Sequence, residues 1–296
     1  MKISLWLLAT VFVFLSAKTS IAVDGNARDY IAAPPGTNLS IVYFQYYNSD
    51  QFMVKGKDLP GKDKLEVSVP FYRFVHYMEL FGLTIDPQIV IPFGKVSTKI
   101  GALGLDQEDA TLGDIVLGST VWLINKPEKQ FWLGLTPWLQ IPTGRYDGDN
   151  FVASSVLASN RYTFVTQLGL EKGLGHGFHF SEYLEADFYS DNDEWTSFSG
   201  ERVTQGKDPW FLSQMALSYD FTPATFCSVK WRYAWGGETD LVGTNQGDKQ
   251  DNHRLDLGFF HWLTKTDQLM VELQKDVKVE NGYESYGFWL RWVHVF

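Results

Sequence analysis

The chain has a single cysteine, Cys227, among its 296 residues. One cysteine can neither close an internal disulfide nor supply a cysteine-rich metal site, so both kinds of scaffold are excluded. Positive charge is also scarce, with 25 lysines and arginines against 35 aspartates and glutamates. Nucleic-acid binding needs a basic surface, and this acidic chain is a poor candidate for it.

Long apolar runs are missing except at the N-terminus, and the mean hydropathy is −0.16. Lys2 precedes an apolar stretch from Ile3 to Ala17, and small residues follow at Ser20 and Ala22. This layout predicts a signal peptide over residues 1–22, with the mature chain starting near Val23. A membrane anchor helix is the alternative, but the apolar run is short for one. A bundle of membrane helices would need several such runs.

Helical periodicity is absent after this segment. The apolar residues instead recur at every second position, in stretches bounded by Gly, Asn, Asp and Pro, which predicts strands. About twelve such segments are present, and most are longer than the five or six residues of ordinary strands and suit the roughly nine to eleven needed to cross a bilayer. Their spans are 37–47, 64–78, 82–92, 112–124, 130–142, 161–171, 177–189, 208–220, 225–235, 253–264, 267–277 and 286–296.

The connections between these segments alternate between long and short. Residues 143–160 and 190–207 form long connections, whereas 172–176 and 221–224 form short ones. Outer-membrane barrels have this asymmetry, with short periplasmic turns and long extracellular loops.

The two faces of the segments differ in polarity. In 267–277, Leu269, Val271 and Leu273 share one face, while Glu272 and Gln274 lie on the other. A soluble antiparallel barrel shows the same alternation with the apolar face inward, so periodicity alone leaves both open. Strand length, loop alternation and the signal peptide favour the membrane version. We therefore predict an all-β fold, a single antiparallel up-and-down transmembrane β-barrel of about 12 strands over residues 23–296.

Aromatic residues make up 16% of the chain and gather near the segment ends. Examples are Tyr43, Trp122, Trp210 and Trp292. Amphipathic rings suit the two interfaces of a bilayer, and we expect these residues in the aromatic girdles of the barrel. Pro137 interrupts the segment 130–142, which predicts a bulge or kink there.

Three stretches, taken together and in order, carry a family resemblance. They are Ala27-Arg28-Asp29-Tyr30 leading to Pro34-Pro35-Gly36, then Gly113-Asp114-Ile115, then Pro137 to Asp147, which reads PWLQIPTGRYD. This set resembles the outer-membrane protein family labelled "MetA-pathway of phenol degradation", over essentially the whole mature chain. The resemblance implies a Gram-negative outer-membrane barrel associated with the breakdown of aromatic compounds. It carries over no functional residue.

The polar face of the strands gives the candidate functional site, because it should line the lumen. Side chains of both charge signs are present with some aromatic ones, which suits a path for small amphipathic solutes and equally suits a plugged barrel. The predicted lumen residues are Asp86, Gln88, Asp114, Trp138, Gln140, Gln167, Glu185, Asp187, Lys230, Arg232, Arg254, Asp256, Glu272, Gln274 and Arg291.

The chain ends in an aromatic strand. Phe288, Leu290, Trp292 and Phe296 lie on one face of it. This resembles the C-terminal signal that the barrel assembly machinery recognises, and it predicts that machinery as a partner, beside outer-membrane lipid and lipopolysaccharide.

Catalytic, cofactor and metal sites are not expected. His179 and Ser181 resemble the pair of outer-membrane lipolytic enzymes, but the alternation turns them toward the lumen and not toward lipid. There is no phosphate-binding or dinucleotide-binding glycine motif. The acidic loops at 147–150 and 191–194 lack a full calcium motif and fit solvated loops better.

The sequence thus favours a channel or facilitator for small hydrophobic or aromatic compounds, and not an enzyme. Two alternatives stay open. One is a structural or adhesive barrel whose acidic extracellular loops carry the function, and the other is an outer-membrane lipolytic enzyme. A soluble barrel in the periplasm is a further alternative, and cell fractionation would then find the protein outside the outer membrane.

Overall fold

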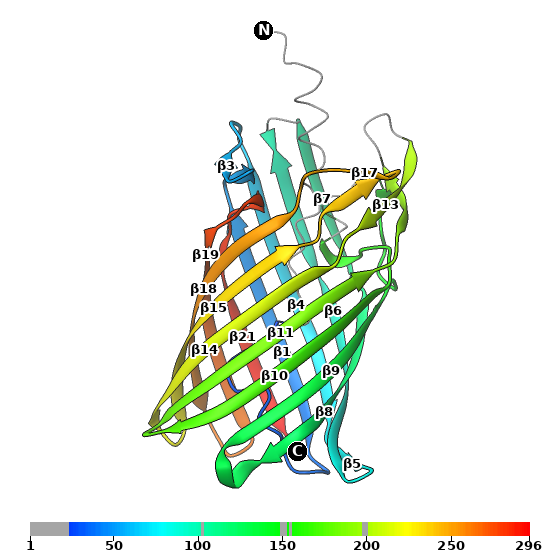
Figure 1. Cartoon of the computed structure of the whole chain (residues 1–296). Coiled ribbons are helices and arrows are strands. Elements are labelled where there is room, and N and C mark those ends of the chain that lie inside the picture. The colour runs from blue at the N-terminus through cyan, green and yellow to red at the C-terminus, as the bar shows by residue number, and fades with distance from the viewer. Residues whose placement is uncertain (1–23, 102–103, 149–152, 154–155, 197–200) are drawn as a thin grey trace.

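The computed structural model describes residues 24–101, 104–148, 153, 156–196 and 201–296, and the expected signal peptide lies outside these ranges. Within them, twelve strands form a closed antiparallel barrel in chain order (Figure 1). The strands are β1 (Asn38–Ser49), β4 (Lys64–His76), β6 (Leu83–Ile100), β8 (Ile115–Lys126), β9 (Phe131–Ile141), β10 (Thr163–Gly175), β11 (Phe178–Tyr189), β14 (Trp210–Thr222), β15 (Thr225–Gly236), β18 (Gln250–Trp262), β19 (Asp267–Lys278) and β21 (Tyr286–Val295).

The first and last strands close the barrel. β1 pairs with β21 from Leu39 opposite Val295 to Asn48 opposite Tyr286. Closure removes the exposed backbone edges that an open sheet would leave in lipid, where no water could satisfy them. The aromatic C-terminal strand is therefore the seam of the barrel.

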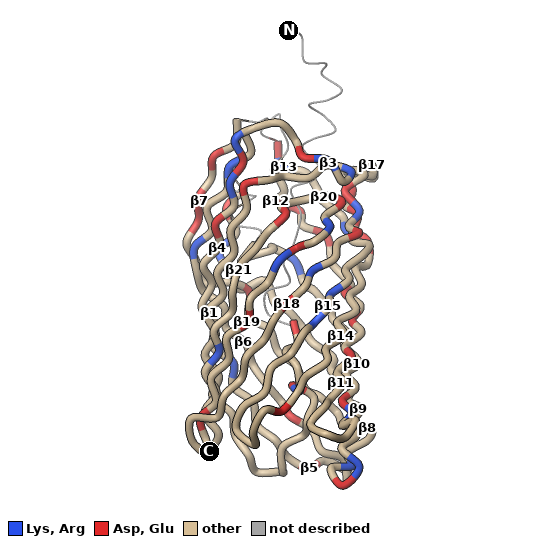
Figure 2. The backbone as a smooth tube through the Cα atoms, turned by 90° about the vertical axis from the view of Figure 1, so that its left-hand side faces the viewer, with Lys and Arg blue, Asp and Glu red and all other residues tan. Residues whose placement is uncertain are grey.

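The two ends of the barrel differ, as the loop lengths predict. Short turns join the strands at the end where β21 finishes, and one of them contains the 3₁₀ turn η3 (Pro127–Lys129). Long connections lie at the opposite end, toward which charged residues gather (Figure 2). We call these the turn end and the loop end. Their lengths assign them to the periplasmic and extracellular sides.

The loop end carries extra strands that the sequence pattern did not predict. β7 (Leu105–Leu112) extends the barrel wall at the loop end by pairing with the second half of β6. One further short strand, β5 (Met78–Leu80), lies at the turn end and pairs with the start of β6. Two small sheets lie among the loops. They comprise β2 (Phe52–Val54), β3 (Lys57–Asp58) and β20 (Asn281–Tyr283) in one, and β12 (Asn192–Thr196), β13 (Arg202–Lys207), β16 (Thr239–Leu241) and β17 (Thr244–Asn245) in the other.

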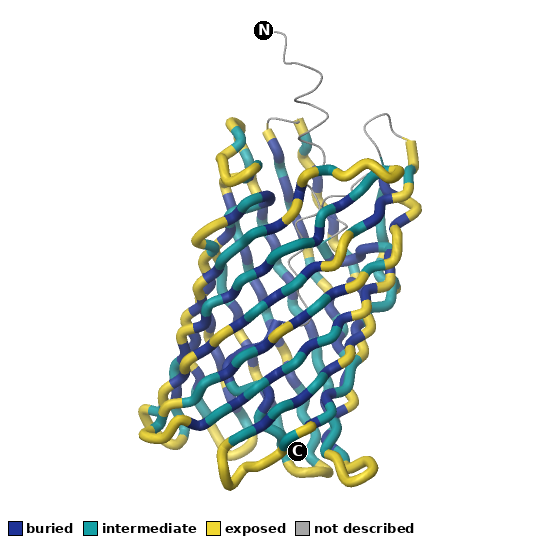
Figure 3. The backbone as a smooth tube through the Cα atoms, viewed as in Figure 1, coloured by how far each residue is buried: buried dark blue, intermediate teal, exposed yellow. Residues whose placement is uncertain are grey.

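Exposed and buried residues alternate along the wall strands (Figure 3). The outer face is apolar in the middle of the barrel, with side chains such as Leu184, Val229, Leu257 and Leu290 between 42% and 57% exposed. Such a surface is costly in water and suits the hydrocarbon of a bilayer. No helix of the described residues is long and apolar enough to cross a membrane.

Two details differ from the expectations. Tyr43, Trp122 and Trp210 are buried inside the barrel and do not belong to an outer girdle. Their positions share the inward face because side chains alternate, and proximity to a strand end does not change that parity. Pro137 causes no bulge, since β9 stays in register with β10 through it, and the irregularity lies instead at Trp122 to Ile124.

The seam provides a test of the closed barrel. A Cβ atom added at Gly287 would lie 2.0 Å from the backbone carbonyl oxygen of Tyr46 across the β1–β21 pair. We expect Gly287→Ala to cost about 1–3 kcal/mol, because the backbone itself must shift. Heat-modifiable gel migration should show the folded band converting at a lower temperature. Leu290→Ala, on the lipid face of the same strand, should convert at a temperature close to that of the wild type. An equal decrease of the conversion temperature in both variants would contradict close packing of β1 against β21.

Candidate functional site: the lumen and its plug

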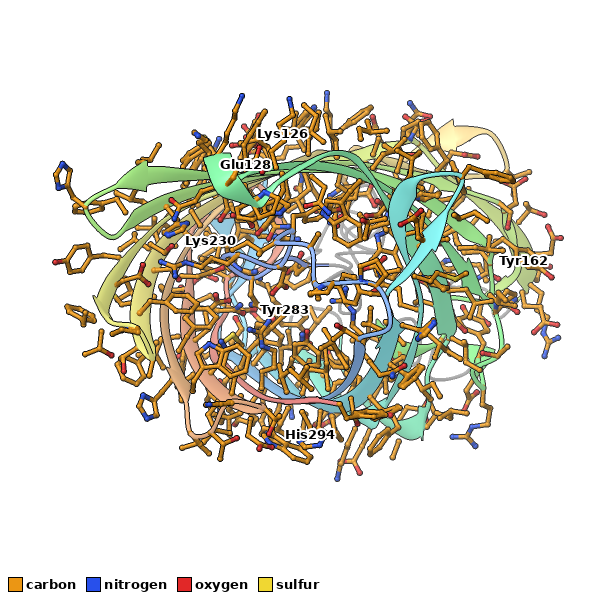
Figure 4. The ribbon with its side chains drawn as sticks, turned by 90° about the horizontal axis from the view of Figure 1, so that it is seen from below. Lys126, Glu128, Tyr162, Lys230, Tyr283 and His294 are labelled. Atoms are coloured by element: carbon orange, nitrogen blue, oxygen red, sulfur yellow. The ribbon has the colours of Figure 1, made fainter. Side chains whose placement is uncertain are left out.

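The lumen contains the chain segment that precedes β1. We call residues 24–33 the plug segment; viewed from the turn end, it lies inside the ring of strands (Figure 4). Its backbone carbonyls are bound by side chains from three different strands. Lys230 Nζ donates to Gly25 O at 3.0 Å, Tyr183 OH to Asn26 O at 2.7 Å, and Trp122 Nε1 to Tyr30 O at 3.0 Å.

The plug segment also folds on itself. The amide of Asp29 donates to Asn26 O, the amide of Ile31 donates to Arg28 O, and Asp29 Oδ2 accepts the amide of Asn26. Arg28 has a φ of 73°, which bends the chain sharply. These local hydrogen bonds satisfy backbone amides and carbonyls that would otherwise lack a partner inside the barrel.

Tyr30 anchors the plug segment to β9 and β10. Gly134 and Gly169 pair directly across these two strands, and the ring of Tyr30 lies over them. A Cβ at Gly169 would lie 2.3 Å from the ring, so only glycine leaves the space. The Tyr30 hydroxyl lies 2.7 Å from Thr136 Oγ1 and donates to Gln167 Oε1 at 2.9 Å.

Ion pairs fix the rest of the segment. Asp24 lies 3.3 Å from Arg232 and 3.0 Å from Arg254, and Asp29 accepts from Arg291 at 2.7 Å. The side chains in these pairs are at most 17% exposed. Low exposure weakens screening by solvent, and it also makes each charge costly if its partner is removed.

Arg28 forms a further pair from the plug segment to the wall. Its guanidinium lies 2.6 Å from Asp220 and donates to Ser218 Oγ, and it stacks 3.9 Å above the ring of Phe226. Charge, hydrogen bonding and a cation–π contact therefore hold one side chain.

A wholly buried cluster of charged side chains on the wall contacts Lys230 and Arg254, which bind the plug segment. Lys230 lies 3.2 Å from Asp256 and 3.0 Å from Glu272, and all three side chains are 0% exposed. Asp256 also accepts from Arg254 Nε at 2.9 Å, and Gln274 donates to Glu272. The cluster orients Lys230 and Arg254 toward the plug segment, beside which Lys230 is seen in Figure 4.

The predicted lumen residues all lie on the inner side of the wall, and all are buried except Gln140, which is half-buried. Five of them bind the plug segment directly, namely Gln167, Lys230, Arg232, Arg254 and Arg291. Asp86, Gln88, Trp138, Glu185, Asp187, Asp256, Glu272 and Gln274 lie around them. Their part in solute passage stays a prediction.

Asp114 and Gln140 have a different place. Asp114 accepts from Gln140 Nε2, from the amide and hydroxyl of Ser159, and from the amide of Gly144. These bonds join the start of β8 to the loop that follows β9. The Gly-Asp motif thus fastens an extracellular loop to the wall.

Side chains from the small sheets pack together at the loop end. Phe52, Ile100 and Trp195 are buried in one cluster with Tyr146 and Tyr283 against it. The hydroxyl of Tyr283 lies 2.6 Å from Thr98 Oγ1 and donates to Lys99 O. Figure 4 shows Tyr283 within the ring of strands, so the loops narrow this entrance.

Described residues line a cavity toward each end of the barrel. A space of about 60 Å³ lies toward the loop end and is lined by Arg232, Arg254 and Tyr283 among others. A larger one of about 470 Å³ lies toward the turn end, where Ile31 and Pro34 of the N-terminal region face Ile41, Val75 and Val293 of the wall. Apolar walls of this volume are what small organic ligands use.

The lipolytic pair does not form a catalytic arrangement among the described residues. Ser181 Oγ donates to Glu171 and accepts the amide of Arg28, while His179 lies 3.5 Å from Asp220. Both side chains therefore serve the plug segment and its surroundings. The described residues also hold no group of three or more His, Cys, Asp or Glu that could bind a metal.

Comparisons with known proteins agree with this architecture. Residues 49–292 match the family model described as "Putative MetA-pathway of phenol degradation". The crystal structure of the COG4313 outer membrane channel from Pseudomonas putida F1 is 30% identical, with a TM-score of 0.85 over 92% of this chain and 100% of that chain. The chain belongs to this family. It is an outer-membrane β-barrel related to a channel.

More distant structures share the fold only. The transport unit of the autotransporter AIDA-I from Escherichia coli is 11% identical, with a TM-score of 0.60 over 97% of this chain and 99% of that chain. The β domain of the Bordetella autotransporter BrkA is 10% identical, with a TM-score of 0.52 over 89% and 100% of the two chains. The search of curated proteins returned no match.

Sequence reasoning missed the plug segment. Pro34 to Gly36 connect to β1, and the residues before them lie in the lumen. The signal was present in Ala27-Arg28-Asp29-Tyr30, which the family resemblance singled out without a role. Gly134 and Gly169, at the middle of two strands, were a second signal, because mid-strand glycine marks a close approach.

The anchor of the plug segment can be tested directly. We expect Gly169→Leu and Tyr30→Ala each to loosen residues 26–32, since the first fills the space of the ring and the second removes it. Hydrogen exchange of the plug amides in detergent micelles should rise by roughly tenfold or more, as loss of about 1.4 kcal/mol would give. Leu184→Ala, on the lipid face of β11, is the control. Unchanged exchange in both plug variants would show that Tyr30 is not the anchor.

The loop end offers a pH test. Asp248 accepts the amide and the hydroxyl of Thr239, each at 2.7 Å, and burial raises its pKa to about 6 from 3.8. Burial favours the neutral carboxyl in the folded loop and outweighs the two Thr239 hydrogen bonds, which favour the carboxylate. The contribution of Asp248 to the stability of the folded loop is therefore greatest below pH 4 and is lost as the pH rises through 6. A spin label at Val242, in a Cys227→Ser background, should become more mobile between pH 4.5 and 7.5. Asp248→Asn should remove that change, and the same change in the variant would assign it to another group.

Proposed function

We propose that this protein is an outer-membrane channel for small hydrophobic or aromatic compounds, and that displacement of the plug segment opens it. One observation carries the proposal: side-chain contacts fasten residues 24–33 inside the barrel. No backbone-to-backbone hydrogen bond joins them to the wall in the described structure. A strand held by a ladder would cost many cooperative bonds to remove. A segment held by separate side chains can leave while the wall stays intact.

The nature of the contacts supports a reversible plug. Arg28, Asp29 and Asp24 each have an oppositely charged partner on the wall. In a buried ion pair the cost of removing both charges from water opposes their Coulomb attraction. The net stabilisation by each pair is therefore smaller than the attraction alone. Entering ions or solutes can also replace either partner.

The lining supports the solute class. Below the plug segment the cavity combines apolar side chains with tyrosines and arginines. Such a surface favours solutes with an apolar body and one polar group over strongly hydrated sugars. We further propose a Gram-negative host, export through residues 1–22, and recognition of the row Phe288, Leu290, Trp292 and Phe296 by the barrel assembly machinery.

Single-channel recording in planar bilayers tests the plug. We expect wild-type protein to be mostly closed, and a variant with Tyr30→Ala and Arg291→Gln together to show an open fraction about tenfold higher or more. Entry of benzenesulfonate into liposomes should rise in parallel, because this anion of a strong acid stays ionised at neutral pH and crosses lipid poorly. Leu184→Ala should behave as wild type.

The outcomes separate the alternatives. No ion current and no benzenesulfonate flux in any variant, despite heat-modifiable folding, would reject the channel and favour a structural or adhesive barrel. Current that is large in wild type and unchanged in the double variant would keep the channel but reject the plug.

A further inference from the structure

The cavity of about 470 Å³ at the turn end has an uneven charge distribution. Four of its lining side chains are cationic and two are anionic. Two of the cations, Arg28 and Arg291, are paired with the two anions, Asp220 and Asp29. Arg73 and Lys265 remain without a carboxylate partner among the described residues.

Arg73 is the cation best placed for a ligand. It projects from the inner face of β4 and lines the cavity. Its Nε donates to Gln88 Oε1 at 2.7 Å, and the guanidinium lies 5.5 Å from the ring centroid of Trp138. These contacts fix the plane of the group, because Gln88 is itself bonded to Asp86. The two terminal nitrogens have no hydrogen-bond partner in the described structure and are not enclosed by protein.

Most of the other residues that line the cavity are apolar. Ile31 and Pro34 form one side, while Ile41, Val75 and Val293 form another. An oriented guanidinium with two unused donors is the preferred protein group for a carboxylate, which it binds through two parallel hydrogen bonds. An apolar chamber beside it accommodates the hydrocarbon body of the same molecule.

We propose that this cavity binds an amphipathic organic anion, a carboxylate on an aromatic or aliphatic body, with Arg73 holding the carboxylate. Lys265, exposed at the periplasmic turn between β18 and β19, supplies a second positive charge that attracts anions to the cavity. The ligand would lie against the plug segment, since residues 27–29 and 31–33 form part of the cavity wall. This inference rests on the proposed channel, because it specifies a class of solute for the same lumen.

Binding should be measured by calorimetry on the full-length protein in nanodiscs, with empty nanodiscs subtracted. The probes are naphthalene-2-carboxylate and the neutral, similarly shaped naphthalene-2-carboxamide. We expect the carboxylate to bind at least about tenfold more tightly, the gain usual for a hydrogen bond to a charged group. Decanoate, as a second carboxylate, separates an aromatic acid from a fatty acid as the preferred source of the anion.

The variants assign the effect to Arg73. Arg73→Gln should remove the preference for carboxylate over carboxamide, Arg73→Lys should retain part of it, and Lys265→Gln should reduce it less. Lys126→Gln is the matched control, because Lys126 carries the same charge at the turn end but does not line the cavity (Figure 4). Heat-modifiable migration confirms that each variant is folded.

Equal affinity for the two naphthalene probes, or an unchanged preference in folded Arg73→Gln, would overturn the inference. These outcomes are independent of the plug experiment. If the double plug variant opens the channel while the carboxylate preference is absent, only the anion site fails. If the preference is present while no variant conducts, only the channel proposal fails.

Discussion

Pairing of buried charges inside the barrel is the constraint on which the rest of the structure depends. The lumen holds acidic and basic side chains such as Lys230, Asp256 and Glu272 with no exposed surface at all. An isolated buried charge costs several kcal/mol, and pairing these side chains at hydrogen-bond distance lowers that cost. The wall alone does not supply every partner. Arg232 and Arg291 find theirs on the plug segment, in Asp24 and Asp29.

This arrangement explains why a polar segment lies in the lumen at all. Its carboxylates neutralise wall arginines, and wall side chains in turn bind its backbone carbonyls. The hydrophobic effect contributes at Tyr30, whose ring covers a pair of glycines that would otherwise leave a gap. Removing the segment would expose several cations at once, so an open lumen would be markedly more attractive to anions than the closed one.

The two ends of the barrel differ in structure. Asp114 and the cluster around Trp195 fix loops at the extracellular end, where described residues line a space of about 60 Å³. The periplasmic end keeps a larger, partly apolar chamber. The two ends of the lumen thus differ in volume and in the polarity of their lining.

The sequence by itself determined the barrel. Period-two alternation, strand lengths and the lengths of the loops are local properties, and they placed eleven of the twelve strands within a few residues. The remaining strand, β6, continues to Ile100, beyond the predicted end at residue 92. The alternation also assigned Asp86, Lys230 and Arg291 to the inner face. Tertiary structure alone decided what fills that barrel. The contacts of Asp24, Arg28 and Tyr30 with the wall join positions 92 to 230 residues apart, and no local pattern records such pairings. The same limit applied to Tyr43 and Trp122, whose inward orientation follows from the strand register and not from their distance to a strand end.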